Sequence, residues 1–296
     1  MEIYLGAILS FGAMTTIGVG DYLAKLASIR IGSIKTSFYV RFLGLIPPVL
    51  VIIFQSAFEK LDYASVDLGS LLIFGTIVGT LMSITHLVYY RGLEIGSVPI
   101  VTTVTSAWVA VSVVLAIIFL GETPTVLHLL IISIIVAGIG IVSGFRVAGF
   151  SEIISSNRTS GFSNGIICML TAGAMAVLAK PMVEAAGPFI ASTYTHILSS
   201  LFLFALIRWR GISLRFSIKD NLKYVAGAAF LTATGLVCLF LAILISPIML
   251  VTPIVAAHPL ITITCARVFE GGRTSGMQNI GIILTVGGII LLGLMG

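Results

Sequence analysis

Charged residues are scarce in this sequence. Asp, Glu, Lys and Arg make up 9% of the 296 residues, whereas hydrophobic residues make up 58%. Soluble domains carry about 25% charged residues, so this chain has too little polar material to cover a surface in water. The mean hydropathy of +1.18 agrees with this. The composition therefore excludes an ordinary soluble domain and predicts an integral, multi-pass membrane protein, which we expect in the plasma membrane.

Cysteines are also few, and the features of a cleavable leader are missing. Cys168, Cys238 and Cys265 lie in apolar segments, and an odd number without framework or metal spacing predicts neither a disulfide scaffold nor a metal site. The first residues, MEIYLGAILS, have no basic region and no small-residue cleavage site. They predict the start of a retained helix rather than a signal peptide.

Motifs of energised or catalytic proteins are missing as well. The sequence has no Walker-type glycine-rich loop, no GxSxG or HExxH motif and no close carboxylate cluster. No filter motif or charged ring of a pore stands out. These absences disfavour an ATP-driven pump, an intramembrane enzyme and a channel, and they predict no cofactor. The basic residues behind the net charge of +5 cluster at helix ends, so we expect a lipid bilayer rather than nucleic acid as partner.

Long apolar runs dominate the chain. A spanning helix needs about 20 mostly apolar residues, and this criterion predicts ten helices in an all-α membrane fold. They cover residues 3–27, 34–56, 67–90, 98–119, 126–146, 161–184, 188–208, 221–245, 247–268 and 277–295. The longest polar interval, RVAGFSEIISSNRTSG, divides the chain almost in half. We therefore predict a first repeat over 1–147, a polar linker over 148–160 and a second repeat over 161–296.

The two halves resemble each other. The spacing of Lys25 and Arg41 recurs, 155 positions later, in Lys180 and His196. Further matches occur at an offset of 150, namely Thr102/Thr252, Ala107/Ala257, Phe119/Phe269, Gly121/Gly271 and Gly138/Gly288. Because five helices per half is an odd number, the second half enters from the opposite face, which is the inverted repeat of many secondary transporters. The alternative is chance similarity between two halves rich in Gly and Ile.

Several segments resemble the EamA-type drug/metabolite transporters. The stretches IGVGDYLAKLA (17–27) and SFYVRFLGLI (37–46) are similar to the first two helices of that family. The segment from YYRGLE to GIVSG (89–144), which includes FLGE, resembles the family's signature for its third to fifth helices, and 241–275 looks like a second copy. Ile17 replaces the usual Trp, Asp21 is unusual, and the second copy reads FEGG instead of FLGE. The resemblance implies a ten-helix, two-repeat carrier that moves a small metabolite, amino acid or drug by alternating access.

Basic and titratable residues inside the apolar runs are candidates for substrate binding or gating. Lys25 and Lys180 either face a central cavity or extend their side chains to the interface. Asp21 precedes Lys25 by four residues on the same helical face, which makes it a candidate partner of Lys25 or a carrier of protons or cations. Arg41 is either a cavity residue or an interfacial anchor. The three histidines in apolar segments, which either pack or titrate near neutral pH, are His86, His196 and His258.

Two segments at the 150-residue offset are candidates for the cavity walls. Pro253 removes a backbone donor within VTPIVAAHPL, so carbonyls there need other partners. The matching stretch IVTTVTSAW carries Thr102 and Trp108, although its hydroxyl groups alternatively bond to their own helix. Tyr39, Tyr89 and Trp108 either line the cavity or belong to interfacial belts.

These observations predict a secondary active transporter or exchanger for a small polar or amphipathic metabolite, monomeric or homodimeric, with proton or ion coupling left open. Efflux of hydrophobic drugs is the main alternative. The distribution of Lys and Arg among the connectors places both termini outside the cell. The family resemblance implies the opposite orientation, so both remain open.

Overall fold

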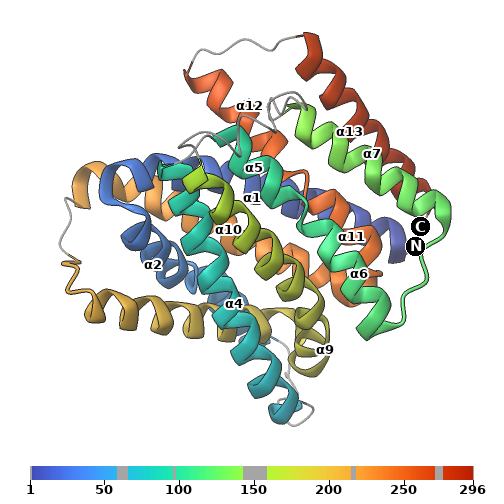
Figure 1. Ribbon diagram of the computed structural model, residues 1–296. Coiled ribbons are helices and arrows are strands. Elements are labelled where there is room, and N and C mark those ends of the chain that lie inside the picture. Colours follow the sequence, from blue (N-terminus) through green and yellow to red (C-terminus); the bar gives the residue numbers. More distant parts are fainter. Residues whose placement is uncertain are drawn as a thin grey trace.

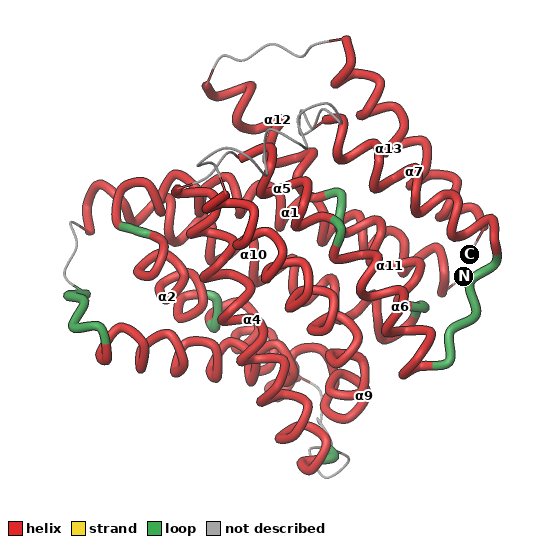
Figure 2. The backbone as a smooth tube through the Cα atoms, in the orientation of Figure 1, coloured by secondary structure: helices red, strands yellow, loops and turns green. Residues whose placement is uncertain are grey.

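The computed structural model describes residues 2–58, 66–95, 98–142, 159–214, 218–270 and 276–295. Every regular element in these ranges is an α-helix, which confirms the all-α prediction (Figures 1 and 2). The predicted linker, 148–160, lies outside the described residues except for its last two, with which a helix begins.

The helices follow the apolar runs of the sequence closely. Their bounds are α1 Glu2–Ile31, α2 Ser33–Leu43, α3 Ile46–Phe58, α4 Leu68–Ile95, α5 Val98–Ser106, α6 Trp108–Leu120, α7 Val126–Val142, α9 Thr159–Trp209, α10 Ile218–Ile245, α11 Ile248–Val255, α12 His258–Glu270 and α13 Gly276–Met295. Among the described residues, seven stretches are long and apolar enough to cross a membrane, and two shorter apolar helices add to them. A membrane protein with several spanning helices is thereby supported.

Interruptions divide the longest helical stretches. The 51 residues of α9 include Gly187, whose φ of 75° and ψ of 162° are non-helical. Glycine populates this region without steric cost, and the chain bends there between 159–186 and 188–209. Single turns separate α5 from α6 at Ala107 and α11 from α12 at residues 256–257. The second pair follows Pro253, which lies inside α11.

Two helices from the two halves of the chain, α7 and α13, pack side by side and run in opposite directions (Figure 1). Gly138 on α7 lies against Thr285, and Gly288 on α13 lies against Ile135. The Gln278 side chain donates a hydrogen bond of 3.2 Å to the Val142 carbonyl at the far end of the same interface. The contacts are reciprocal, because residues 138 and 285 of one contact correspond to 288 and 135 of the other at the offset of 150.

Two glycines bring helices into close contact around the centre of the bundle. A Cβ atom at Gly18 would lie 2.6 Å from the His258 carbonyl oxygen, and one at Gly173 would lie 2.9 Å from the Trp108 carbonyl oxygen. Small residues allow such close approach of helices in membranes. Gly18 and Gly173 are 155 positions apart, and Trp108 and His258 are 150 apart. Each glycine therefore packs against the equivalent helix of the other half.

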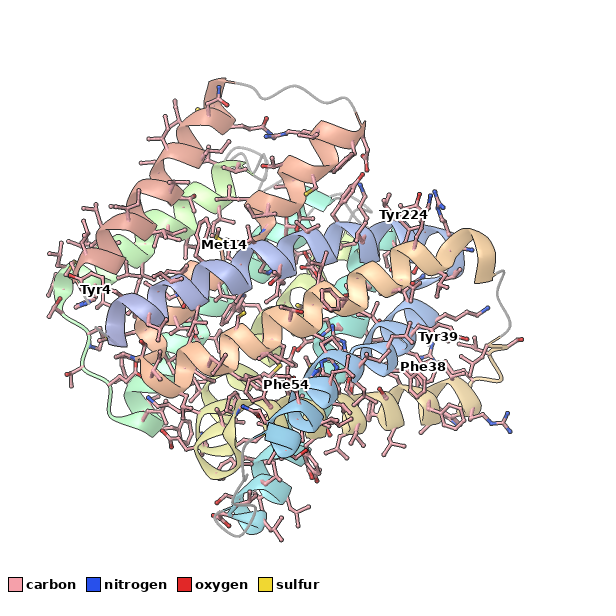
Figure 3. All side chains as sticks on the ribbon, turned by 180° about the vertical axis from the view of Figure 1, so that it is seen from behind. Tyr4, Met14, Phe38, Tyr39, Phe54 and Tyr224 are labelled. Atoms are coloured by element: carbon pink, nitrogen blue, oxygen red, sulfur yellow. The ribbon has the colours of Figure 1, made fainter. Side chains whose placement is uncertain are left out.

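Much of the outer surface is apolar. Ile8, Phe11, Phe54, Ile118 and Ile283 each expose more than half of their surface. In water such exposure over many helices would favour aggregation, whereas a bilayer covers it. Figure 3 shows Tyr4 on α1 and Phe54 on α3 at the outside of the bundle.

Candidate cavity between the two halves

A cavity lies at the centre of the bundle, where helices from both halves meet. It encloses about 730 Å³, counting space that is continuous with the outside. The residues that line it are Ile17, Asp21, Arg41, Met82, Thr85, His86, Tyr89, Thr105, Trp108, Cys168, Ala172, Met175, Ala176, Thr232, Leu236, Leu239, Val255 and His258. Both halves of the chain thus contribute to the lining.

An acidic residue and a histidine form a pair on the polar side of the cavity. Asp21 on α1 and His258, the first residue of α12, are both buried, and Asp21 Oδ2 lies 3.1 Å from His258 Nδ1. The Tyr89 ring lies edge-on to the His258 ring, with the centroids 6.3 Å apart. Gly18, one turn before Asp21, allows α1 to approach α12 closely enough for this pair.

Arg41 is the most deeply buried cation of the cavity, with 1% of its surface exposed. Its Nη2 lies 3.4 Å from Thr232 Oγ1 and its Nη1 lies 3.7 Å from Met82 Sδ, which are both weak contacts. Its Nε has no hydrogen-bond partner among the described residues. A buried guanidinium without a close carboxylate is unusual, because buried charges are normally paired.

The cavity lining is paired between the halves, yet its two sides differ in chemistry. His86 and Tyr89 on α4 correspond to Leu236 and Leu239 on α10 at the offset of 150, and all four line the cavity. The same comparison relates His258 to Trp108, and at the offset of 155 it relates Asp21 to Ala176. In these four pairs the titratable member lies on one side and its counterpart on the other side is apolar, whereas in Met82/Thr232 and Thr105/Val255 the hydroxyl group lies on the second side.

Half of the residues that the sequence singled out line the cavity. These are Asp21, Arg41, His86, Tyr89, Trp108 and His258. Thr102 and Pro253 are buried in α5 and α11 and do not line the cavity, whereas Thr105 and Val255 on the same two helices do. His196 is fully buried against Gly44. The Tyr39 hydroxyl donates a hydrogen bond of 2.7 Å to the Leu214 carbonyl, near the end of the bundle (Figure 3).

The expected pairing of Asp21 with Lys25 is replaced by two other pairs. Lys25 Nζ lies 3.2 Å from Glu270 Oε1, at the end of α12, whereas Asp21 pairs with His258. Asp21 and Lys25 lie four residues apart on α1 but do not pair with each other. Each pairs instead with a residue of α12, because that helix packs directly on α1. Neither Lys25 nor Lys180 belongs to the cavity lining.

Lys180 has a similar partner at the end of α6. Its Nζ lies 4.0 Å from Glu122 Oε1. The Glu122 carboxylate also accepts hydrogen bonds from the backbone N–H groups of Ile248 and Met249, at 2.7 and 2.9 Å. A carboxylate at this position satisfies free donors at the start of α11. Glu122 thereby connects the first half of the chain to two helices of the second.

The sequence did not point to the apolar part of the lining. Met82, Met175, Leu236 and Leu239 look like ordinary core residues in a chain of this composition. The offset of 150 relates Leu236 and Leu239 to the candidates His86 and Tyr89, and this signal could have identified the two leucines. Among the described residues, no group of three His, Cys, Asp or Glu side chains is placed to hold a metal ion.

An all-helical membrane bundle with a central cavity between two similar halves has the construction of a membrane transporter. The EamA-like transporter family matches the sequence twice, over residues 4–144 and 159–294. The chain therefore belongs to the EamA-like transporter family, within the drug/metabolite transporter superfamily. This membership supports a transporter rather than an enzyme.

Comparison with solved structures gives the same fold. One chain, described only as the crystal structure of a protein, has a TM-score of 0.76 and 15% sequence identity, and the match covers 98% of this chain and 96% of that one. At this identity the likeness establishes the fold alone. A comparison with curated proteins gives no match.

Proposed function

We propose that the protein is a secondary active transporter or exchanger that moves a small polar or amphipathic metabolite across the plasma membrane by alternating access. The central cavity, lined by both halves of a chain of the EamA-like transporter family, is the observation that carries this proposal. In secondary transporters the substrate site lies at the interface of the repeats, near the middle of the membrane. The polar and apolar sides of the cavity suit a substrate with both kinds of surface.

The proposed architecture has ten membrane crossings in two inverted repeats. The crossings of the first repeat are α1, α2 with α3, α4, α5 with α6, and α7. Those of the second are the two parts of α9, α10, α11 with α12, and α13. The contact of α7 with α13 is antiparallel and reciprocal. It supports the inverted arrangement, because a two-fold axis perpendicular to the two helices produces such contacts. The reciprocal packing of Gly18 and Gly173 supports it independently.

The two lysine–glutamate pairs are the proposed gates. Since α7 and α13 are antiparallel, the ends of α6 and α12 that precede them lie at opposite ends of the bundle (Figure 1). Lys180–Glu122 and Lys25–Glu270 therefore join the two halves at opposite ends. Alternating access requires that contacts between the halves break at one end and form at the other. Ion pairs that stabilise a closed end by a small amount are suited to this role.

Proton coupling through the Asp21–His258 pair is part of the proposal. Asp21 and His258 are ionisable side chains that line the cavity from different helices, and Asp21 Oδ2 lies 3.1 Å from His258 Nδ1. The titratable or charged groups facing the pair from other helices are Arg41 on α2, His86, Tyr89 and Tyr90 on α4, and Cys168 on α9. The cavity lining from α10 and α11 is not titratable, with Thr232, Leu236, Leu239 and Val255. A proton held between Asp21 and His258 changes the charge of the site in which the substrate binds.

The function is tested with purified protein in liposomes. A thermal-shift screen of amino acids, organic acids, amines, sugars and nucleosides first identifies ligands, because a ligand at 100 times its Kd adds about 2.7 kcal/mol to the native state. Counterflow of a radiolabelled hit into liposomes loaded with unlabelled hit then tests transport. A carrier gives transient accumulation above equilibrium, whereas a channel gives simple equilibration. Saturable counterflow of hydrophobic drugs alone would favour the alternative, an efflux carrier for such compounds.

A further inference from the structure

We infer that Arg41 is the anion-binding residue of the cavity, and that it binds the carboxylate of an amphipathic substrate. This inference rests on the proposed transport function and names the substrate class. Arg41 lies in the last turn of α2, lines the cavity and is 1% exposed. Its guanidinium forms no ion pair within 4.0 Å among the described residues, and its Nε has no hydrogen-bond partner there.

The described residues around Arg41 provide no counter-ion within 4.0 Å, so an anionic ligand can pair with its guanidinium. Asp21 is the carboxylate of the cavity, and its Oδ2 lies against His258 Nδ1. The guanidinium contacts the Met82 thioether at 3.7 Å and the Thr232 hydroxyl at 3.4 Å, and it also interacts with the neutral hydroxyl of Tyr90. The Thr232 hydroxyl donates at 2.7 Å to the Ala228 carbonyl and offers the guanidinium only the lone pair of a neutral oxygen. A carboxylate that enters the cavity would be a stronger partner than any of these, through the forked geometry of arginine.

The remainder of the cavity selects for an apolar body. Trp108, Leu236 and Leu239 line the side that corresponds, across the two halves, to His258, His86 and Tyr89, and Met175 adds to the apolar lining. Of these, Trp108 presents the largest apolar surface and is 6% exposed. A ligand with its carboxylate on Arg41 and a ring or alkyl chain against this side uses both halves of the cavity. Pockets of this kind combine apolar walls with a few polar groups that fix orientation.

Trp108 supplies a direct readout of binding. The chain has two tryptophans, and the other, Trp209, is 82% exposed at the end of α9. In a Trp209→Phe variant the fluorescence reports on Trp108, inside the cavity. The matched probes are 3-phenylpropionate, its neutral isostere 3-phenylpropionamide, the cation 3-phenylpropylamine, and phenylalanine. Each is titrated into the purified, full-length protein, with thermal shift as a second readout.

The inference predicts saturable binding of 3-phenylpropionate, at least tenfold tighter than that of the amide or the amine. This comparison needs no change to the cavity, so it holds even if an Arg41 variant fails to fold. Arg41→Gln is expected to remove the preference for the carboxylate, and Arg41→Lys to retain part of it. Arg91→Gln is the matched control, because Arg91 is half exposed on α4 and pairs with Glu94 at 3.2 Å. Equal affinities for acid and amide, or an undiminished preference in Arg41→Gln, would overturn the inference.

Two further results separate the alternatives. Tighter binding of phenylalanine than of 3-phenylpropionate would assign the ammonium group to Asp21 and keep the carboxylate on Arg41. Tightest binding of the amine, lost in Asp21→Asn, would instead make Asp21 the recognition residue and contradict the assignment of Arg41. Binding and transport are independent measurements here. Carboxylate binding that depends on Arg41 without counterflow would refute the transport proposal alone, whereas counterflow that is unaffected by Arg41→Gln would refute the inference alone.

Discussion

Trp108 and His258 begin equivalent helices, α6 and α12, and both line the same cavity. They are 150 positions apart in the sequence, and each lies just after a turn that interrupts an apolar helical stretch. The two positions are thus related by the repeat, although one side chain is a large apolar ring and the other is titratable. This difference gives the cavity its apolar and polar sides.

Trp108→Ala is expected to weaken binding of ligands with an apolar body by about 10- to 100-fold. Burial of a large apolar side chain contributes about 1.5–3 kcal/mol, and about 1.4 kcal/mol corresponds to a factor of ten in affinity. Thermal-shift titration measures the effect, since the variant lacks the fluorescent reporter. Trp209→Ala, at an exposed position, is the control and should bind as the unchanged protein does. Equal loss in both variants would contradict the placement of the apolar body.

Close packing around the centre predicts that Gly18→Ala and Gly173→Ala each lower stability by about 1–3 kcal/mol, the usual cost of overpacking. Each new methyl group would meet a backbone carbonyl within 3 Å, which cannot rotate away. The midpoint of thermal unfolding in detergent measures the effect. Gly12→Ala is the matched control within α1, because its new methyl group would lie 3.9 Å from Cys238 Sγ, its nearest neighbour. A loss for Gly12→Ala as large as for Gly18→Ala would contradict this account of the packing.

The proposed gates predict rescue by charge exchange. Lys25→Glu and Glu270→Lys are each expected to slow counterflow severalfold, because like charges then replace the ion pair whose Nζ and Oε1 atoms lie 3.2 Å apart. The double variant restores an attractive pair and should recover most of the rate. Glu122→Gln tests the other end, where it also weakens the contacts to the start of α11. Single variants that transport normally would show that these pairs are surface ion pairs without a gating role.

The Asp21–His258 pair predicts that transport responds to a pH gradient and that Asp21→Asn abolishes this response. Asparagine keeps the size of the side chain but binds no proton in the physiological range. Counterflow at several pH values, measured with and without a gradient, gives the comparison. His128→Asn is a control, since His128 lies at the start of α7 and bonds to Thr125. A pH response that persists in Asp21→Asn would contradict coupling through this pair.

Much of the fold could be predicted from the sequence because membrane helices are constrained by length and hydropathy. The predicted segments 67–90, 126–146 and 221–245 agree with α4, α7 and α10 within a few residues. The break at Gly187 falls in the gap between the predicted segments 161–184 and 188–208. The turn at Ala107 lies inside the predicted segment 98–119 and was not predicted, since a one-residue interruption leaves the apolar pattern intact. The division into domains and the roles of the site residues remain predictions.

The partners of the candidate residues could not be predicted. The sequence suggested Asp21, four residues away on the same helix, as the ion-pair partner of Lys25. The partner in the structure is Glu270, which lies 245 positions away. The same holds for Lys180 and Glu122, which come from different halves. Such pairings depend on which helices pack together, and the spacing of charges along one helix does not contain that information. The apolar lining was missed because leucines of a cavity and of a core look alike in sequence.

The most direct test of alternating access is a pair of distance measurements by double electron–electron resonance on the reconstituted protein, with the native cysteines replaced. One pair of spin labels, at Thr123 and Glu184, spans the end of the bundle near Lys180–Glu122, and both positions are exposed. The second pair, at Ile29 and Val268, spans the end near Lys25–Glu270, also at exposed positions. Addition of a transported ligand is expected to lengthen one distance and shorten the other. Distances that both stay fixed, or that change in the same sense, would contradict a carrier with two alternating gates.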